Sequence, residues 1–122
     1  MRRLSAWAPV LAWMGLIFWL SSQPNVPTLS VGWLDQAAKN GGHMALYFVL
    51  ALLLDRAWRQ EAMWPHARVP AVLVIALLYA LSDEWHQSFV PGRSPSLADV
   101  GFDMAGAALA LWVREKTWPG VL

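Results

Sequence analysis

The clearest indication of the fold is an apolar stretch, Val69-Pro-Ala-Val-Leu-Val-Ile-Ala-Leu-Leu-Tyr-Ala-Leu81. It continues in a helix-like pattern through Ser82-Asp-Glu-Trp-His-Gln87. Three further stretches with little or no charge surround it, at Ala6–Leu20, Met44–Leu54 and Leu97–Val113. A helix needs roughly 20 residues, within a range of about 17–25, to cross the hydrocarbon core of a bilayer. With their flanks included, the four stretches predict four transmembrane helices, at about 4–22, 40–57, 69–89 and 96–113.

The composition also indicates a membrane protein. Hydrophobic residues make up 57% of the 122 residues and charged residues 14%, whereas about 25% of an average soluble domain is charged. The nine tryptophans favour the membrane–water boundary, where we expect them to act as anchors. The lack of cysteine excludes a disulfide scaffold, and the net charge of +1 argues against nucleic acid as a partner. We predict an all-α fold, a single domain over residues 1–122 built as a four-helix transmembrane bundle.

The first apolar stretch has a second interpretation. Met1-Arg-Arg3 followed by an apolar run is also typical of a signal peptide. No clear small-x-small cleavage site follows in Trp19-Leu-Ser-Ser-Gln-Pro24, so we expect this segment to remain as a helix.

Lysine and arginine are unevenly divided between the two sides of the predicted bundle. One side carries Arg2, Arg3, Arg56, Arg59, Arg68, Arg114 and Lys116, and the other carries Lys39 and Arg93. Because basic residues are retained on the cytoplasmic side of a membrane, we predict that both termini lie in the cytoplasm.

The connections follow from this arrangement. Ser21–Gly32 is predicted to be an uncharged external loop. We expect Asp55 and Arg56 to end the second helix at the cytoplasmic boundary, and Trp58 and Trp64 to anchor an internal loop over Arg56–Arg68.

Polar residues of the outer side share helix faces. The stripes comprise Lys39, His43 and Tyr47 on the second helix, Tyr79, Asp83, Glu84, His86 and Gln87 on the third, and Asp99 and Asp103 on the fourth. A charge inside a spanning helix costs about 2.5–3.5 kcal/mol, so such residues usually face the interior of the bundle and pair. Together the stripes predict one polar pocket that opens outward.

The fourth helix carries recognisable start and packing signals. Ser96-Leu-Ala-Asp99 is typical of a capping box, and Val90-Pro-Gly-Arg93 before it is typical of a type II turn. Arg93 then lies beside a helix N-terminus, where free N–H groups favour an anion and a guanidinium can bind phosphate or carboxylate in bidentate fashion. The alternatives are that Arg93 only pairs with Glu84 or Asp99, and that Asp99 only caps the helix. Further along, Gly106 and Ala110 are small residues four apart and allow close helix contact.

These residues also carry a resemblance to a known family. Lys39-Asn-Gly-Gly-His43-Met-Ala-Leu-Tyr47, followed by Ser82-Asp-Glu-Trp-His-Gln-Ser-Phe-Val-Pro-Gly-Arg93-Ser-Pro-Ser-Leu-Ala-Asp99-Val-Gly-Phe-Asp103-Met-Ala-Gly106, resembles the VanZ-like family over residues 35–113. Asp103 stands where many members have Asn, and the spacing from Lys39 to His43 is one residue longer than in some. The resemblance implies a small multi-pass protein of the bacterial inner membrane, in a family with some members linked to teicoplanin and lipoglycopeptide resistance.

Three functions fit this pattern. In the first, the pocket binds an anionic envelope lipid, an antibiotic or a cell-wall precursor headgroup, and the binding residues are Lys39, Tyr47, Gln87, Arg93, Asp99 and Asp103. In the second, the protein is an enzyme acting on such a lipid, with His43 or His86 as general base and Asp83 or Glu84 as the acid or orienting group. In the third, it is a small structural or interaction subunit whose polar cluster only fixes helix packing.

Metal dependence is a variant of the enzyme hypothesis. His43, His86, Asp83 and Glu84 could supply ligands from two helices, but their spacing differs from His-Glu-x-x-His and no cysteine is available. We therefore predict neither a metal nor a cofactor, and the sequence leaves the oligomeric state open.

Overall fold

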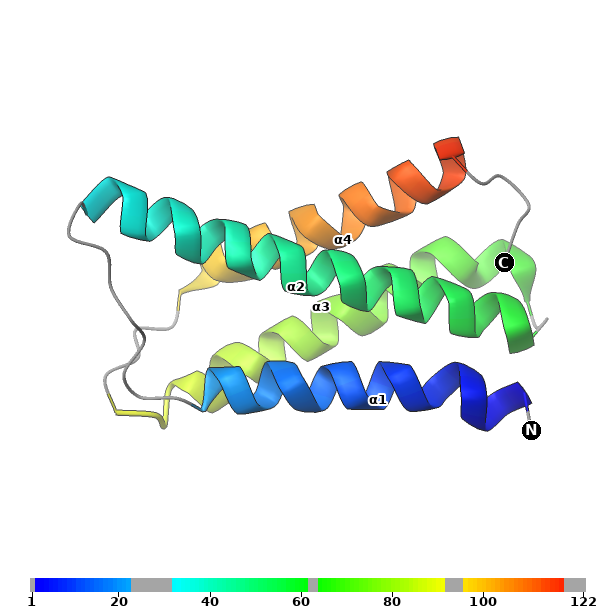
Figure 1. Cartoon of the computed structure of the whole chain (residues 1–122), viewed down its shortest axis with the longest axis horizontal. Coiled ribbons are helices and arrows are strands. Elements are labelled where there is room, and N and C mark those ends of the chain that lie inside the picture. The colour runs from blue at the N-terminus through cyan, green and yellow to red at the C-terminus, as the bar shows by residue number, and fades with distance from the viewer. Residues whose placement is uncertain (1, 23–31, 62–63, 92–95, 118–122) are drawn as a thin grey trace.

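The computed structural model describes residues 2–22, 32–61, 64–91 and 96–117, which form helices and turns and contain no strand, so the predicted all-α fold is confirmed. The helices are α1 (Arg2–Ser21), α2 (Gly32–Glu61), α3 (Arg68–Gln87) and α4 (Leu97–Thr117), with a short 3₁₀ turn, η1 (Pro65–Ala67), before α3. Successive helices alternate in direction (Figure 1). The start of α1, the end of α2, the start of α3 and the end of α4 therefore share one end of the bundle, which we call the terminal end; the opposite end is the far end.

Helix α2 is longer at both ends than the predicted 40–57. It begins at Gly32, and its first turns are supported by Asp35, which suits the positive N-terminal end of the helix dipole and pairs with Lys39 at 3.0 Å. At the other end Asp55 does not terminate the helix, because Arg59 bonds it from the next turn at 2.8 Å. The predicted loop over Arg56–Arg68 is therefore wrong, since α2 continues to Glu61.

The other three helices lie closer to their predicted bounds. Helices α1 and α3 differ by only one or two residues at each end. Helix α4 runs past the predicted end to Thr117, and its last turn carries Arg114 and Lys116, cations that favour a helix C-terminus. Most of the predicted external loop, residues 23–31, lies outside the described residues.

Two of the helices, α2 and α3, are long and apolar enough to cross a membrane, and a shorter apolar helical stretch covers Ser5–Ser21. Helix α4, predicted to span, does not meet the same test among the described residues. Large apolar side chains are exposed along the bundle, among them Leu11 and Leu16 of α1 and Val74, Leu78 and Leu81 of α3.

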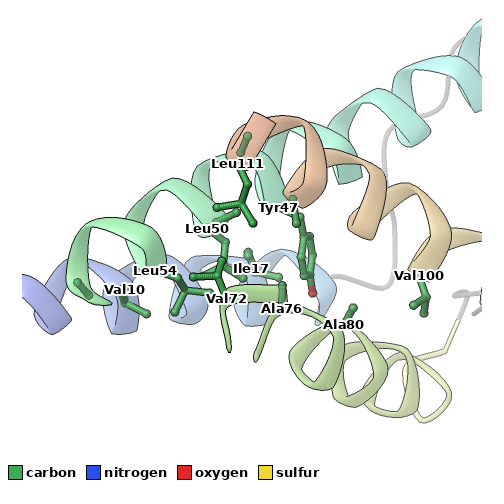
Figure 2. Packing of buried hydrophobic residues seen from close by; sticks show 14 of the residues in the cluster. Val10, Ile17, Tyr47, Leu50, Leu54, Val72, Ala76, Ala80, Val100 and Leu111 are labelled. Atoms are coloured by element: carbon green, nitrogen blue, oxygen red, sulfur yellow. The ribbon is translucent and has the colours of Figure 1, made fainter. Parts of the chain in front are cut away.

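The core is built from small residues that bring the helices close together. Its larger members include Tyr47, Val10, Ile17, Leu50, Leu54, Val72 and Leu111 (Figure 2). They belong to one cluster with the buried alanines Ala51, Ala76, Ala80, Ala107 and Ala110. At Gly106 of α4, an added Cβ would overlap the backbone of Met44 on α2. The predicted close approach of helices at Gly106 is confirmed.

Helix α1 is attached to the others by aromatic side chains that reach across to neighbouring helices. Trp13 donates its indole N–H to the Leu46 carbonyl at 2.8 Å, and Trp7 donates to Glu61 Oε1 at 3.1 Å. The Tyr79 hydroxyl donates to the Met14 carbonyl. Trp7 and Trp13 thus join helices, whereas Trp19, Trp33, Trp64, Trp85 and Trp112 are exposed, as membrane-boundary tryptophans would be.

Candidate functional site

A small hollow with a volume of about 70 Å³, partly open to the outside, lies between α1, α2 and α3 toward the far end. Its lining residues are Ile17, Leu20, Ser21, His43, Leu46, Tyr47, Asp83 and Gln87. Its apolar residues come from α1 and α2, and its polar residues come from all three helices. This mixture is typical of sites that bind an amphipathic molecule.

His43 is held in place by Asp103. The Nδ1 atom of His43 lies 2.8 Å from Asp103 Oδ1, although the two residues are on different helices, α2 and α4. Asp103 is fully buried, while the His43 side chain is 19% exposed and reaches the hollow. A carboxylate bonded to one ring nitrogen orients the imidazole and leaves the other nitrogen for a ligand or a proton.

Tyr47 forms the floor of the hollow. It is completely buried, and its ring points from α2 toward α3 (Figure 2), with its centroid 6.3 Å from that of Tyr79. Its hydroxyl has no hydrogen-bond partner within the described residues. Buried polar groups are nearly always paired, so this hydroxyl marks a place where a bonding group is missing.

Asp83 and Gln87 complete the polar wall from α3. Both are buried, one helical turn apart, and both line the hollow. Gln87 donates its side-chain N–H to the Ser21 hydroxyl at 3.4 Å, which links α3 to the end of α1. The structure therefore brings His43, Tyr47, Asp83 and Gln87 together from two predicted stripes on two helices, with Asp103 behind His43 on α4.

Glu84 is turned away from this group and toward α4. Its Oε2 accepts the backbone N–H of Ser96 at 2.7 Å, and the Ser96 hydroxyl in turn accepts the N–H of Ala98 at 3.1 Å. The predicted capping box is therefore half formed: Ser96 caps α4, but Glu84 takes the place in it that we expected Asp99 to fill. Glu84 thus ties the end of α3 to the start of α4 through one oxygen, while its other oxygen, Oε1, is buried without a hydrogen-bond partner among the described residues.

Three other predicted site residues lie outside the hollow. The His86 ring stacks on Phe18 of α1, with centroids 4.3 Å apart and planes 16° apart. Lys39 pairs with Asp35 on its own helix, and Asp99 is half-buried in the first turn of α4. None of the three contributes to the lining of the hollow.

Arg93 and the glycine of the predicted type II turn lie outside the described residues, as does any anion site built on them. The preceding residues form a tight turn, in which Phe89 N–H bonds the His86 carbonyl and Val90 N–H bonds the Gln87 carbonyl.

The described residues contain no group of three or more His, Asp or Glu side chains placed to hold a metal ion. The four residues considered for a metal do not converge, because His86 stacks on α1 and Glu84 bonds the start of α4.

A second polar cluster, not anticipated from the sequence, lies at the terminal end. Asp55 is fully buried and accepts hydrogen bonds from Arg59 (2.8 Å) and from Arg68, while Arg114 Nε lies 3.9 Å away. Arg59 and Arg68 both also bond Oε1 of Glu115, which is 45% exposed. We call these five residues the arginine cluster. The one local signal for it was the spacing of four between Asp55 and Arg59.

Comparison with known proteins gives one match. The profile of a family described as VanZ/LLP1 matches residues 6–115, a span that includes the hollow and the arginine cluster. No curated protein and no solved structure matches the chain.

Proposed function

The chain belongs to the VanZ/LLP1 family, and from this membership and its two apolar helices we propose that it is a multi-pass protein of the bacterial inner membrane, with both termini in the cytoplasm. The distribution of basic residues supports this orientation. Arg59, Arg68 and Arg114 lie at the terminal end, whereas Lys39 lies toward the far end. The terminal end is then cytoplasmic and the far end external.

The orientation can be tested directly, because the chain has no cysteine of its own. His66 at the terminal end and Ser88 near the far end are both exposed. In intact cells, a membrane-impermeant maleimide should label Ser88→Cys and leave His66→Cys unlabelled. Labelling of His66→Cys but not of Ser88→Cys would show that the protein has the opposite orientation.

We further propose that the hollow binds or modifies the headgroup of an envelope lipid, glycolipid or cell-wall precursor. The observation that carries this proposal is the His43–Asp103 pair set against the hollow, at 2.8 Å. A charged pair inside a bundle is costly and usually marks a functional site. The apolar side chains of Ile17 and Leu46 beside it suit the hydrophobic part of such a molecule.

The same geometry can serve binding or catalysis. With Asp103 bonded to Nδ1, the second ring nitrogen of His43 could accept a hydrogen bond from a ligand or act as a general base. His86 is the weaker candidate for the base, since its ring stacks on Phe18. Following the family resemblance, we propose that the activity contributes to resistance against glycopeptide antibiotics such as teicoplanin.

A structural role is the alternative, and one observation favours it. Glu84, one of the candidate acids, acts as a link between α3 and the cap of α4. If the whole polar group worked in this way, changing His43 would remove the protein from the membrane instead of removing an activity.

Native mass spectrometry of the purified full chain in detergent tests the proposal. We expect wild-type protein to carry a co-purified lipid or precursor. In the His43→Gln variant the fraction of protein that carries this molecule should fall at least tenfold, while the amount of the variant in the membrane stays normal. The exposed His66 gives a matched control, so His66→Gln should behave as wild type. A wild-type protein without any bound molecule, or a His43→Gln protein that retains it, would contradict the proposal.

A further inference from the structure

Each polar side chain that lines the hollow can accept a hydrogen bond, and one of them is a carboxylate. Its polar residues are Ser21, His43, Tyr47, Asp83 and Gln87, and among the described residues that line it none is lysine or arginine. Asp83 is the one carboxylate among them, and a second carboxylate, Asp103, lies directly behind His43. Of the two basic residues expected to attract an anion, Lys39 pairs with Asp35 outside this lining, and Arg93 is beyond the described part of the chain.

Two buried oxygen atoms next to the hollow point to a missing donor. The Tyr47 hydroxyl and Asp103 Oδ2 both lack a hydrogen-bond partner within the described residues, although both residues are fully buried. One N–H of the nearby Gln87 amide is already directed to Ser21, at 3.4 Å. Leaving buried oxygen atoms without donors is unfavourable, so a ligand that brings several N–H groups would fit here.

We infer that the hollow receives an ammonium group, so that the ligand of the proposed function is an amine-bearing headgroup instead of an anionic one. An ammonium brings three N–H donors and a positive charge. Asp83 would pair with the charge, and the Tyr47 oxygen at the floor would accept one of the N–H groups. This inference rests on the proposed function. It replaces the anionic group that we expected from the sequence with a cationic one.

The apolar wall indicates what the ammonium is attached to. Ile17, Leu20 and Leu46 line the hollow together with the polar residues. A short methylene chain or a glycerol backbone can pack on such a wall while the ammonium reaches the carboxylate. Ammonium groups of this kind occur on lipid headgroups and on small soluble amines, and the experiment must separate the two sources.

The test uses the purified full chain in a non-ionic detergent, titrated with defined lipids and followed by native mass spectrometry. The probes are phosphatidylethanolamine, its N-acetylated form and phosphatidylglycerol, with soluble phosphoethanolamine as a fourth. N-acetylation removes the charge and two N–H donors but keeps the rest of the molecule. We expect phosphatidylethanolamine to bind at least tenfold more tightly than either other lipid. If phosphoethanolamine competes equally well, the source of the amine is soluble.

Substitutions inside and outside the hollow then test where the lipid binds. Asp83→Asn should weaken phosphatidylethanolamine binding at least tenfold and Tyr47→Phe several-fold, whereas Asp35→Asn, a carboxylate outside the hollow, should leave it unchanged. Because the comparison of lipids needs only wild-type protein, a variant that fails to fold does not affect the main result. Equal or tighter binding of phosphatidylglycerol or the N-acetylated lipid would overturn the ammonium inference and leave the proposed function standing. Binding of none of the probes, with no co-purified molecule, would overturn both.

Discussion

The two ends of the bundle bury carboxylates in opposite ways. At the terminal end, Asp55 is fully buried, and both of its oxygen atoms accept hydrogen bonds from arginine side chains. At the far end, Asp103 is equally buried but pairs through one oxygen with His43, and its other oxygen has no partner within the described residues. A buried charge with all its bonds made is typical of a structural link, whereas an incompletely bonded one is a candidate for binding or catalysis.

The arginine cluster explains how the Asp55 carboxylate can be buried at the terminal end. Arg59 comes from the same helix as Asp55, Arg68 from the start of α3, and Arg114 and Glu115 from the end of α4. Each of Arg59 and Arg68 bonds both acids, so three helices are held in one register. Removing one partner from such a buried group is far more costly than the net stabilisation that the group provides.

The largest expected effect follows from breaking this cluster. Asp55→Asn leaves the arginines beside a neutral amide, and we expect the free energy of unfolding to fall by about 3–5 kcal/mol. Denaturant unfolding of the purified protein in detergent measures the change. An effect below that of the far-end change Asp103→Asn would contradict the contrast between the two ends.

A second prediction concerns the contact that brings α2 and α4 together near the far end. Gly106→Ala places a methyl group against the backbone of Met44 and should destabilise the protein by about 1–3 kcal/mol, while separating His43 from Asp103. Gly101 on the same helix is exposed with open space around it, so Gly101→Ala is the matched control. Alanine favours a helix over glycine by roughly 0.5–1 kcal/mol, so this control should be neutral or stabilising.

At the far end itself, Asp103→Asn should lower the free energy of unfolding by less than Asp55→Asn does. The amide oxygen can still accept a hydrogen bond from His43, so we expect a loss of about 1 kcal/mol in unfolding free energy. Ligand binding at the hollow should fall much further than stability, because His43 loses the carboxylate that orients it. A loss of stability as large as that of Asp55→Asn would mean that both ends are structural.

The smallest effects come from a matched pair of tyrosines. The Tyr79 hydroxyl bonds the Met14 carbonyl, so Tyr79→Phe should lose about 1 kcal/mol of stability. Tyr47 has no such partner in the described residues, so Tyr47→Phe should leave stability nearly unchanged or raise it slightly. Thermal unfolding of the two variants side by side checks this; equal losses would show that the Tyr47 hydroxyl is already bonded in the folded protein.

Patterns among neighbouring residues in the sequence were sufficient to predict much of this fold. Hydropathy predicted the four helices, and the spacing of small residues on the fourth helix predicted its close contact at Gly106. Ser96 was correctly identified as a cap, because capping depends only on the next few residues. The length of α2 was missed, since the polar turns around Asp35 and Asp55 interrupt the apolar pattern without interrupting the helix.

The candidate site could be predicted only in outline. The sequence placed His43, Asp83 and Asp103 on outward stripes of three helices, but not which of them meet. His43 and Asp103 are 60 residues apart, and their pairing depends on how α2 and α4 are rotated about their axes. For the same reason, the sequence alone could not reveal that Glu84 and His86 face α4 and α1 and lie outside the hollow.

By itself, then, the sequence determined the all-helical class, the apolar spans, the cap of α4 and the family, because each depends on residues that are near neighbours along the chain. Tertiary structure alone decided which charges on different helices are paired. It placed arginines from three helices around Asp55, and at the other end it left the Tyr47 hydroxyl and Asp103 Oδ2 without a hydrogen-bond partner among the described residues. The physical reason is that hydrogen bonding requires contact within about 3 Å, and only helix packing sets distances between residues so far apart in the chain.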